Sequence, residues 1–198
     1  ASGKLVKTVW TREDDIQGGM YRPAFLHRFR IGLDAAGMPI AWKQVSVGQS
    51  VMTGGPFEKV AVVNGVDAFS IEGTHTAPYV KNIADQRIEL NTPVWPITID
   101  NWRAVGFSHT IFAMESLTDE LAHAAGKDPV AYRRMLLKDA PRLLNVLNLA
   151  AAKSGWETPL PAGHGRGVAV FEAMGSFSAV VAEISVSKNV PLKVDRVT

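Results

Sequence analysis

A block of helical periodicity occupies the middle of the chain, between two stretches that alternate in the manner of β-strands. Ser108 is predicted to cap the first helix, and Gly126 to end it. Asp128 and Pro129 begin a second helix, and a third ends at Gly155. The apolar positions that repeat along the first helix are Ile111, Met114, Leu117, Leu121 and Ala125. Strands, then helices, then strands predict an α+β fold, with mixed or antiparallel sheets layered against helices.

The first hundred residues are predicted to be rich in β-structure. Residues 24–48 have the alternation and central turn of a hairpin. One side of its first strand carries Phe25, His27, Phe29 and Ile31. Residues 4–10 also alternate and predict a strand, and residues 85–90 and 95–99 predict two shorter ones. Residues 48–69 are loop-like, with room for a short helix.

The C-terminal third is predicted to return to β-structure. From Gly167 we expect a long apolar strand, a turn at Lys188 and Asn189, and a partner strand. The chain is therefore divided into a β-rich part, residues 1–100, and a part with helices and terminal strands, residues 101–198. Both are treated as parts of one region.

Composition excludes several classes of function. The 198 residues carry a formal net charge of +2, and Lys and Arg are interspersed with Asp and Glu, so no basic tract for nucleic acid is present. The sequence contains no cysteine, which rules out disulfides, thiolate zinc sites, iron–sulfur ligation and a cysteine nucleophile within this chain. It also lacks an apolar run long enough to span a bilayer.

Metal-binding and nucleophile motifs are absent from the sequence. The five histidines, at positions 27, 75, 109, 123 and 164, have no zinc-site spacing, so each is interpreted as a surface or capping residue. His109 stands apart only because it lies at a predicted helix start near Arg103. Neither Ser108 nor Ser176 lies in a nucleophile elbow. We therefore predict no metal ligands within this chain.

Two carboxylates differ from the others in their surroundings. Glu115 is expected to point inward from the first helix, and Glu172 lies in an apolar strand before a Met-Gly-Ser turn. A carboxylate in such a strand is costly unless it is paired, so Glu172 has either a structural or a functional role. The remaining acidic residues are expected to be solvated or to cap a helix, and they include Glu13, Asp14, Asp15, Asp119 and Glu120.

Residues 102–106, Trp-Arg-Ala-Val-Gly, immediately precede the first predicted helix. A helix start presents unpaired N–H groups and the positive end of the helix dipole, which together suit an anion. The same position suits an ordinary loop. The residues alone leave both interpretations open.

Three segments, in order, resemble the molybdopterin-binding region of the xanthine dehydrogenase and aldehyde oxidase family. They are "VKTVWTREDDIQGGMYRPAFLHRFRIGLD", "WRAVGFSHTIFAMESLTDELAHAAGKDPVAYRRMLL" and "GRGVAVFEAMGSFSAVVAEISV". The second is similar to that family's arginine-glycine loop, inward helix with a glutamate, and Asp-Glu-Leu-Ala signature. The chain is most similar to the branch of the isoquinoline 1-oxidoreductase beta-subunit type. The resemblance implies the fold type of a molybdenum cofactor-binding domain.

The resemblance assigns roles to two loops. Arg103, Ala104, Val105 and Gly106 match the loop that approaches the molybdenum end of the cofactor. Gly175, Ser176 and Phe177 match the loop on the opposite wall of the substrate pocket, so Val105 and these three residues are the implied pocket residues. Val105 stands where purine-oxidising members have a stacking aromatic, and their pocket arginine is absent at Val66-Asp67. The implied substrate is therefore an aldehyde or a neutral N-heterocycle rather than xanthine.

The resemblance also implies components beyond these residues. The cofactor is expected to be molybdopterin as a cytosine dinucleotide, and the iron–sulfur clusters are expected on a small partner subunit. The base glutamate and the rest of the large subunit would lie outside this chain, which we expect to be an internal segment that is inactive alone. The compartment, bacterial cytoplasm or periplasm, stays open. The alternative is a scaffold or interaction domain that kept the fold without the chemistry.

Overall fold

The computed structural model describes residues 3–188 and 190–198. Its elements are α1 (Arg12–Gly18), β1 (Phe25–Leu33), β2 (Pro39–Gly48), α2 (Glu58–Ala61), β3 (Val62–Val63), β4 (Val66–Asp67), the 3-10 helix η1 (Ala68–Ile71), β5 (Asp85–Asn91), α3 (Phe107–Ala124), α4 (Pro129–Leu136), α5 (Pro141–Ser154), β6 (His164–Ala173), β7 (Ser176–Ser187) and β8 (Val190–Val197). The predicted α+β fold is confirmed.

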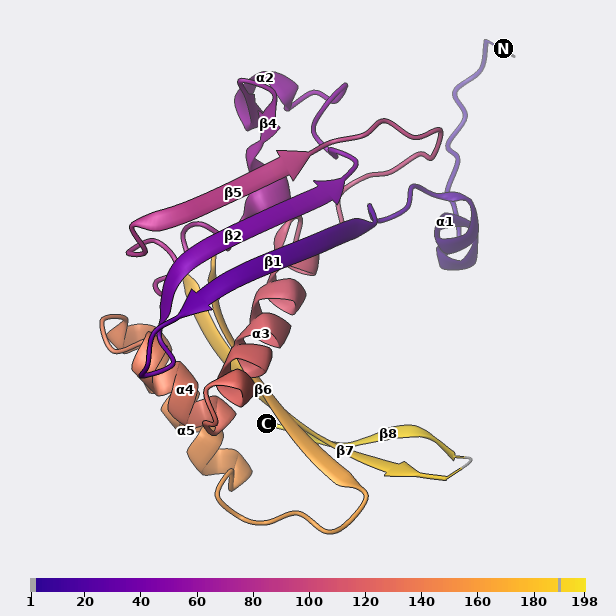
Figure 1. The fold of residues 1–198 in the computed structure, drawn as a ribbon. Helices are drawn as coiled ribbons and strands as arrows, with labels where there is room; N and C mark the ends of the chain where they lie inside the picture. The colour runs from indigo at the N-terminus through magenta and orange to yellow at the C-terminus, as the bar shows by residue number, and fades with distance from the viewer. Residues whose placement is uncertain (1–2, 189) are drawn as a thin grey trace.

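Two three-stranded sheets frame the molecule, and α3 runs between them (Figure 1). In the first sheet, β1 pairs antiparallel with β2, and β2 pairs parallel with β5. In the second, β6, β7 and β8 are antiparallel neighbours. The first sheet is mixed because the chain between β2 and β5 crosses over through α2, β3, β4 and η1.

Two apolar cores join the helices to the two sheets. One joins the first sheet to α3 and α4 through residues such as Trp42, Val80, Met114, Leu121 and Tyr132. The other joins α4 and α5 to the second sheet, with Val130, Leu147, Val168 and Val181 among its members. Helix α4 contributes to both cores, so it couples the two halves.

The hairpin at residues 24–48 is confirmed, and the side of β1 that carries Phe25, His27, Phe29 and Ile31 is the less exposed one. Asp128 caps α4 by accepting bonds from the amides of Val130 and Ala131, as predicted. Gly155 ends α5 in the left-handed conformation. The two helix-end signals, Asp128 and Gly155, are confirmed because each depends on one residue and its immediate chain neighbours.

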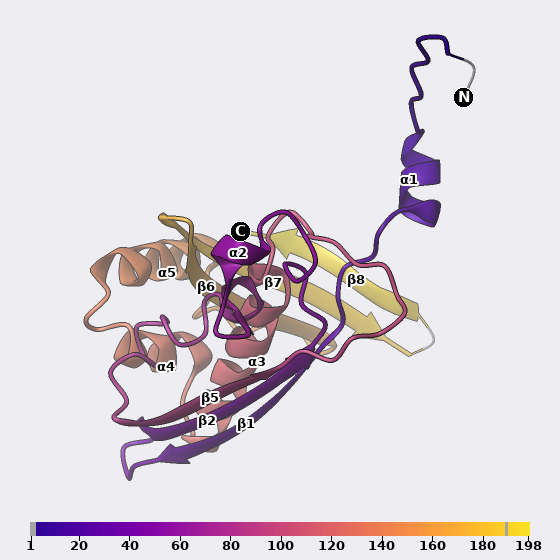
Figure 2. The same ribbon diagram turned by 90° about the horizontal axis from the view of Figure 1, so that it is seen from above.

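The predicted strand at residues 4–10 is wrong. This segment and α1 project from the body in both views (Figures 1 and 2), and none of its described residues lies in a strand. The acidic residues that follow form the first turn of α1, where Thr11 and Asp14 make a reciprocal capping box. Alternation without a neighbouring strand does not produce a sheet.

Three further predictions need correction. Ser108 does not cap α3, because the helix begins at Phe107 and the Ser108 hydroxyl donates to the Val105 carbonyl at 2.7 Å. Residues 95–99 form no strand and make one isolated bridge, Tyr21 to Ile99. The C-terminal region contains three strands, because Met174 and Gly175 turn the chain between β6 and β7. Lys188 follows β7, whereas Asn189 of the predicted turn lies outside the described residues.

No helix among residues 3–188 and 190–198 is long and apolar enough to cross a membrane.

Candidate functional site

Two turns hold non-glycine residues in the left-handed backbone region. Val105, before α3, has φ of 46°, and Met174, between β6 and β7, has φ of 49°. The third such residue in the described chain is Asn64, in a tight Asn-Gly turn where asparagine is favoured. A β-branched residue with this backbone is a conformational outlier that costs about 1–2 kcal/mol. Strain of this kind tends to occur at functional sites.

A cavity of about 330 Å³ lies between α3, the end of β6 and the segment 73–79. Phe107, which directly follows the Val105 turn, and Met174 both line it. Its walls combine apolar side chains, among them Met114 from α3 and Phe171 from β6, with the carboxylates of Glu115 and Glu172. Met174 of the second turn therefore lines the cavity itself, whereas the Val105 turn adjoins it through Phe107. The size of the cavity is in the range used for small ligands.

The first turn exposes a free cation. The Val105 amide donates to the Trp102 carbonyl at 2.8 Å and closes a tight turn that leaves Arg103 and Ala104 exposed. Within the described part of the chain, nothing pairs with the Arg103 guanidinium. It is therefore available for an anionic group.

Close packing of α3 against η1 explains why Gly106 is a glycine. A Cβ at this position would lie 1.6 Å from the carbonyl oxygen of Phe69, so only glycine allows α3 to approach η1 this closely. Its amide donates to the Glu72 carboxylate at 3.1 Å, and the Phe107 amide also favours that carboxylate. Burial raises the pKa of Glu72, and the amide bonds oppose this rise. The start of α3, which the sequence offered to an external anion, is thus already occupied by Glu72.

The three pocket residues implied for the second turn, Gly175, Ser176 and Phe177, do not all face the cavity. Gly175 and Ser176 are exposed at the tip. Phe177 instead packs toward α5, where the Arg142 guanidinium lies 4.1 Å above its ring centroid. Across the hairpin, Phe177 is in register with Glu172, which is exposed at the rim of the cavity. Met174 contacts the cavity, whereas Phe177 lines a separate groove against α5.

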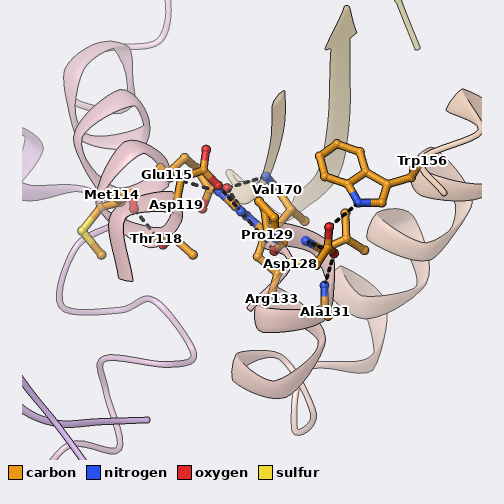
Figure 3. Close-up of polar contacts among 11 residues, drawn as sticks. Met114, Glu115, Thr118, Asp119, Asp128, Pro129, Ala131, Arg133, Trp156 and Val170 are labelled. Carbon is orange, nitrogen blue, oxygen red and sulfur yellow. Dashed lines mark hydrogen bonds and ion pairs between the residues drawn. The ribbon is translucent and has the colours of Figure 1, made fainter. Parts of the chain in front are cut away.

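A buried ion-pair network ties α3 to the strand that carries the second turn (Figure 3). Arg133 of α4 donates to the Glu115 carboxylate at 3.0 Å and also to Asp119. The same Glu115 oxygen accepts the Val170 amide of β6 at 2.8 Å. The inward orientation expected of Glu115 is confirmed, but the solvated role expected of Asp119 is wrong. The sequence already linked the two residues, because Asp119 and Arg133 both lie in the second of the three segments that resemble the family.

Sequence reasoning missed a histidine pair beside the first turn. His27 Nε2 lies 3.0 Å from His109 Nδ1, and the His109 ring stacks on Phe25 with centroids 3.7 Å apart. The sequence placed His27 on the same side of its strand as Phe25 and Phe29, and His109 at a helix start. Only the packing of α3 on β1 brings them together.

Asp67, before η1, is fully engaged within the fold. Its carboxylate accepts the hydroxyls of Ser50 and Ser70 and the amide of Phe69. Asp67 therefore shapes the start of η1. No group of three or more His, Asp or Glu side chains in the described ranges is arranged to hold a metal ion.

Comparison with known proteins gives one family and a consistent fold. The chain is 28% identical over 194 residues to isoquinoline 1-oxidoreductase subunit beta of Brevundimonas diminuta, a match that covers 96% of this chain and 24% of that protein. Its fold is similar to quinoline 2-oxidoreductase from Pseudomonas putida 86, with TM-score 0.59, 19% identity and coverage of 82% and 23%. For aldehyde oxidoreductase from Desulfovibrio gigas the TM-score is 0.52, with 18% identity and coverage of 82% and 19%. The chain spans less than a quarter of each relative.

A family model, the molybdopterin cofactor-binding domain, matches residues 1–137 and so includes the Val105 turn and all of α3. Because this match covers more than half of the sequence, the chain belongs to the molybdopterin cofactor-binding domain family.

Proposed function

We propose that this chain is the cofactor-contacting part of the catalytic subunit of a molybdenum hydroxylase that oxidises an aldehyde or a neutral N-heterocycle. The observation that carries the proposal is the free guanidinium of Arg103, exposed on a strained turn that leads directly into the cavity wall at Phe107. Membership of the molybdopterin cofactor-binding domain family supports this choice over other anion-binding functions.

The residues present fit an anionic cofactor in part. Arg103 offers charge-assisted hydrogen bonds to a phosphate or pterin oxygen, and the small side chain of Ala104 lets such a group approach the backbone. Val105 and Gly106 act differently, because Val105 turns the chain and the Gly106 amide is held by Glu72. We therefore assign direct contact to Arg103 and Ala104, and positioning of the turn to Val105 and Gly106.

When bound, molybdopterin would supply the two-electron oxidation chemistry. The chain's own contribution is to hold the cofactor at Arg103 and to present an apolar wall that excludes water and orients a planar substrate. Phe107, Met114 and Phe171 would form that wall. We propose a glutamate elsewhere in the subunit as the base, since Glu115 is committed to Arg133 and the Val170 amide.

Two features support this substrate class. Aromatic and aliphatic side chains such as Phe107, Met114 and Phe171 line part of the cavity, and the position of the purine-reading arginine holds Val66 and Asp67. The isoquinoline and quinoline oxidoreductases to which the chain is similar act on neutral heterocycles by name. We propose that the cofactor is the cytosine dinucleotide form. Electrons would leave through iron–sulfur clusters of a small partner subunit, since this chain has no cysteine to bind them.

Metal and pterin analysis of the intact protein tests the proposal. The purified protein should contain molybdenum and a pterin in about equal amounts, and Arg103→Ala should lower both by roughly tenfold, as expected for a lost charged hydrogen bond. Arg30→Ala, which removes an exposed arginine of β1, is the matched control and should retain both. Protein from a host that makes the cofactor but containing neither molybdenum nor pterin would instead support the scaffold alternative.

Activity assays separate the substrate classes. An aromatic aldehyde and isoquinoline should be oxidised by the intact protein, and xanthine should not. We expect the 198-residue chain alone to be inactive. Turnover by the isolated chain, or preferential oxidation of xanthine, would contradict these assignments.

A further inference from the structure

The His27–His109 pair is half-buried between β1 and the first turn of α3. Beyond the 3.0 Å contact between the two rings, His27 Nδ1 lies 2.9 Å from the Ser46 hydroxyl oxygen. That oxygen also accepts a bond from the Gln44 side chain at 3.1 Å. The imidazoles thus end a polar chain that begins on buried residues of β2.

The hydrogen bonding of the pair depends on its proton count. With both rings neutral, a single N–H lies between His27 Nε2 and His109 Nδ1 and bridges them. If both rings are protonated, two N–H groups face each other and the bridge is lost. A single added proton keeps the bridge but leaves a cation in a half-buried site, where burial disfavours the charged form.

Burial is the main factor that opposes protonation of the pair. Burial lowers the pKa of His27 and lowers that of His109 to about 3, with His27 and Arg22 adding to the second shift. Asp67 acts in the opposite direction, but its carboxylate is already satisfied by three donors. The groove beside the pair also contains Arg28 of β1 and Glu120 of α3, one charge of each sign.

The histidine pair is connected to the Val105 turn, residues 102–106. The amides of His109 and Thr110 donate to the Gly106 carbonyl, so His109 lies one helical turn beyond that turn. His109 also shares a small cavity with Trp102 and Val105 on the inner side of the turn. A shift of the His109 ring away from β1 would therefore move the start of α3.

We propose that the His27–His109 pair is a proton-controlled latch that holds the first turn of α3, and with it residues 102–106, against the β1–β2 hairpin. With the pair neutral, the latch is closed by the ring–ring bond and the Phe25 stack. Proton uptake stabilises an open state in which the imidazolium rings are hydrated. This inference does not depend on the identity of the cofactor.

Hydrogen–deuterium exchange of the intact protein at pH 7.5 and 5.0, corrected for intrinsic rates, tests the latch. Each imidazole that is protonated only in the open state should favour opening by about 30-fold over this interval, given an ordinary pKa of about 6.5. Protection of the amides at 108–110 should fall by at least that factor, while those of α5 should keep theirs. The double variant His27→Gln/His109→Gln should lose this pH dependence. His123→Gln, at the exposed far end of α3, should retain it.

Unchanged protection at 108–110 between the two pH values would overturn the proposal, as would an unaltered pH dependence in the double variant. An NMR titration of the wild-type imidazole protons provides a second measurement should the double variant not fold. The two rings should titrate together and well below the ordinary value. Independent titration of both near about 6.5 would equally overturn the latch.

Discussion

The guanidinium of Arg133 and the carboxylate of Glu115 lie 3.0 Å apart, and both side chains are buried. The Glu115 oxygen that receives this bond also accepts the Val170 amide (Figure 3). One carboxylate therefore joins α3, α4 and β6, between the two apolar cores. Because α3 follows the Val105 turn and β6 ends at the Met174 turn, this network connects the two elements from which these turns extend.

Removing the Arg133 guanidinium should severely destabilise the protein. Arg133→Met leaves Glu115 buried without its charge partner, and loss of one member of such a pair costs about 3–5 kcal/mol. The free energy of unfolding, from urea titration of the purified protein, measures this cost. Glu115→Gln should cost less, since an amide oxygen can still accept the Val170 N–H.

The control lies one position along the same helix. Arg134 is exposed and bonds only to Asn148 among described residues, so Arg134→Ala should cost less than about 1 kcal/mol. Equal losses for Arg133→Met and Arg134→Ala would show that burial of the network contributes nothing special.

Strain at Val105 predicts that glycine gives a more stable protein than alanine at this position, the reverse of their usual order. In the left-handed region glycine is unstrained, whereas alanine retains the Cβ clash, so Val105→Gly should be more stable than Val105→Ala by about 1 kcal/mol. Both variants lose the same half-buried side-chain packing to within one methyl group. Thermal or urea unfolding of the two proteins gives the difference directly.

Ala104 provides the reference for this comparison. Its φ is not positive, so Ala104→Gly should follow the ordinary order and destabilise by about 0.5–1 kcal/mol. If Val105→Gly proved less stable than Val105→Ala, the left-handed backbone would not be the source of strain in this turn.

Much of the fold was predictable because its signals are local. Asp128 and Pro129 mark the start of α4 through a side-chain cap and a fixed φ, and Gly155 marks the end of α5. By contrast, the alternation at residues 4–10 could not reveal that no strand lies beside them in the described chain. Pairing is a tertiary property, so period-two patterning alone overestimates strands at exposed segments.

The candidate site was predictable only in part, for a similar reason. The residues of the 102–106 loop could be selected from the sequence, but the carboxylate that occupies its helix start is Glu72, from a segment 34 positions earlier. Likewise, Phe177 follows Ser176 directly but packs under Arg142 of α5. Contacts of this range are decided by how α3 and α5 pack on the sheets, which sequence spacing does not contain.

Stability should depend on pH through the histidine pair. Folding lowers the pKa of His27 and His109, so the unfolded chain binds more protons than the folded one at acidic pH. The stabilising contribution is complete above the ordinary pKa of about 6.5 and declines as the pH falls toward about 3, the value of His109. Each ring contributes at most about 2 kcal/mol between pH 7.5 and 5.0, reduced by solvent screening because the rings are only half-buried.

Urea unfolding across that interval, compared between wild type and His109→Gln, isolates this contribution from the other groups that titrate. The variant should have a shallower pH dependence. The same slope in both proteins would assign acid destabilisation to other residues.

The Met174 turn has an internal counterpart that makes its strain measurable. Met174-Gly175 and Asn64-Gly65 are both two-residue hairpin turns with two positive φ values, but only the second has the preferred asparagine. Met174→Asn should stabilise the protein by about 0.5–1 kcal/mol, because the exposed methionine loses little packing and the backbone conformation becomes favourable. Asn64→Met, the reciprocal change in the β3–β4 turn, should destabilise by a similar amount. Differential scanning calorimetry of both variants checks the pair: opposite shifts in Tm are expected, and a destabilised Met174→Asn would mean that the methionine side chain makes a contact that outweighs the strain.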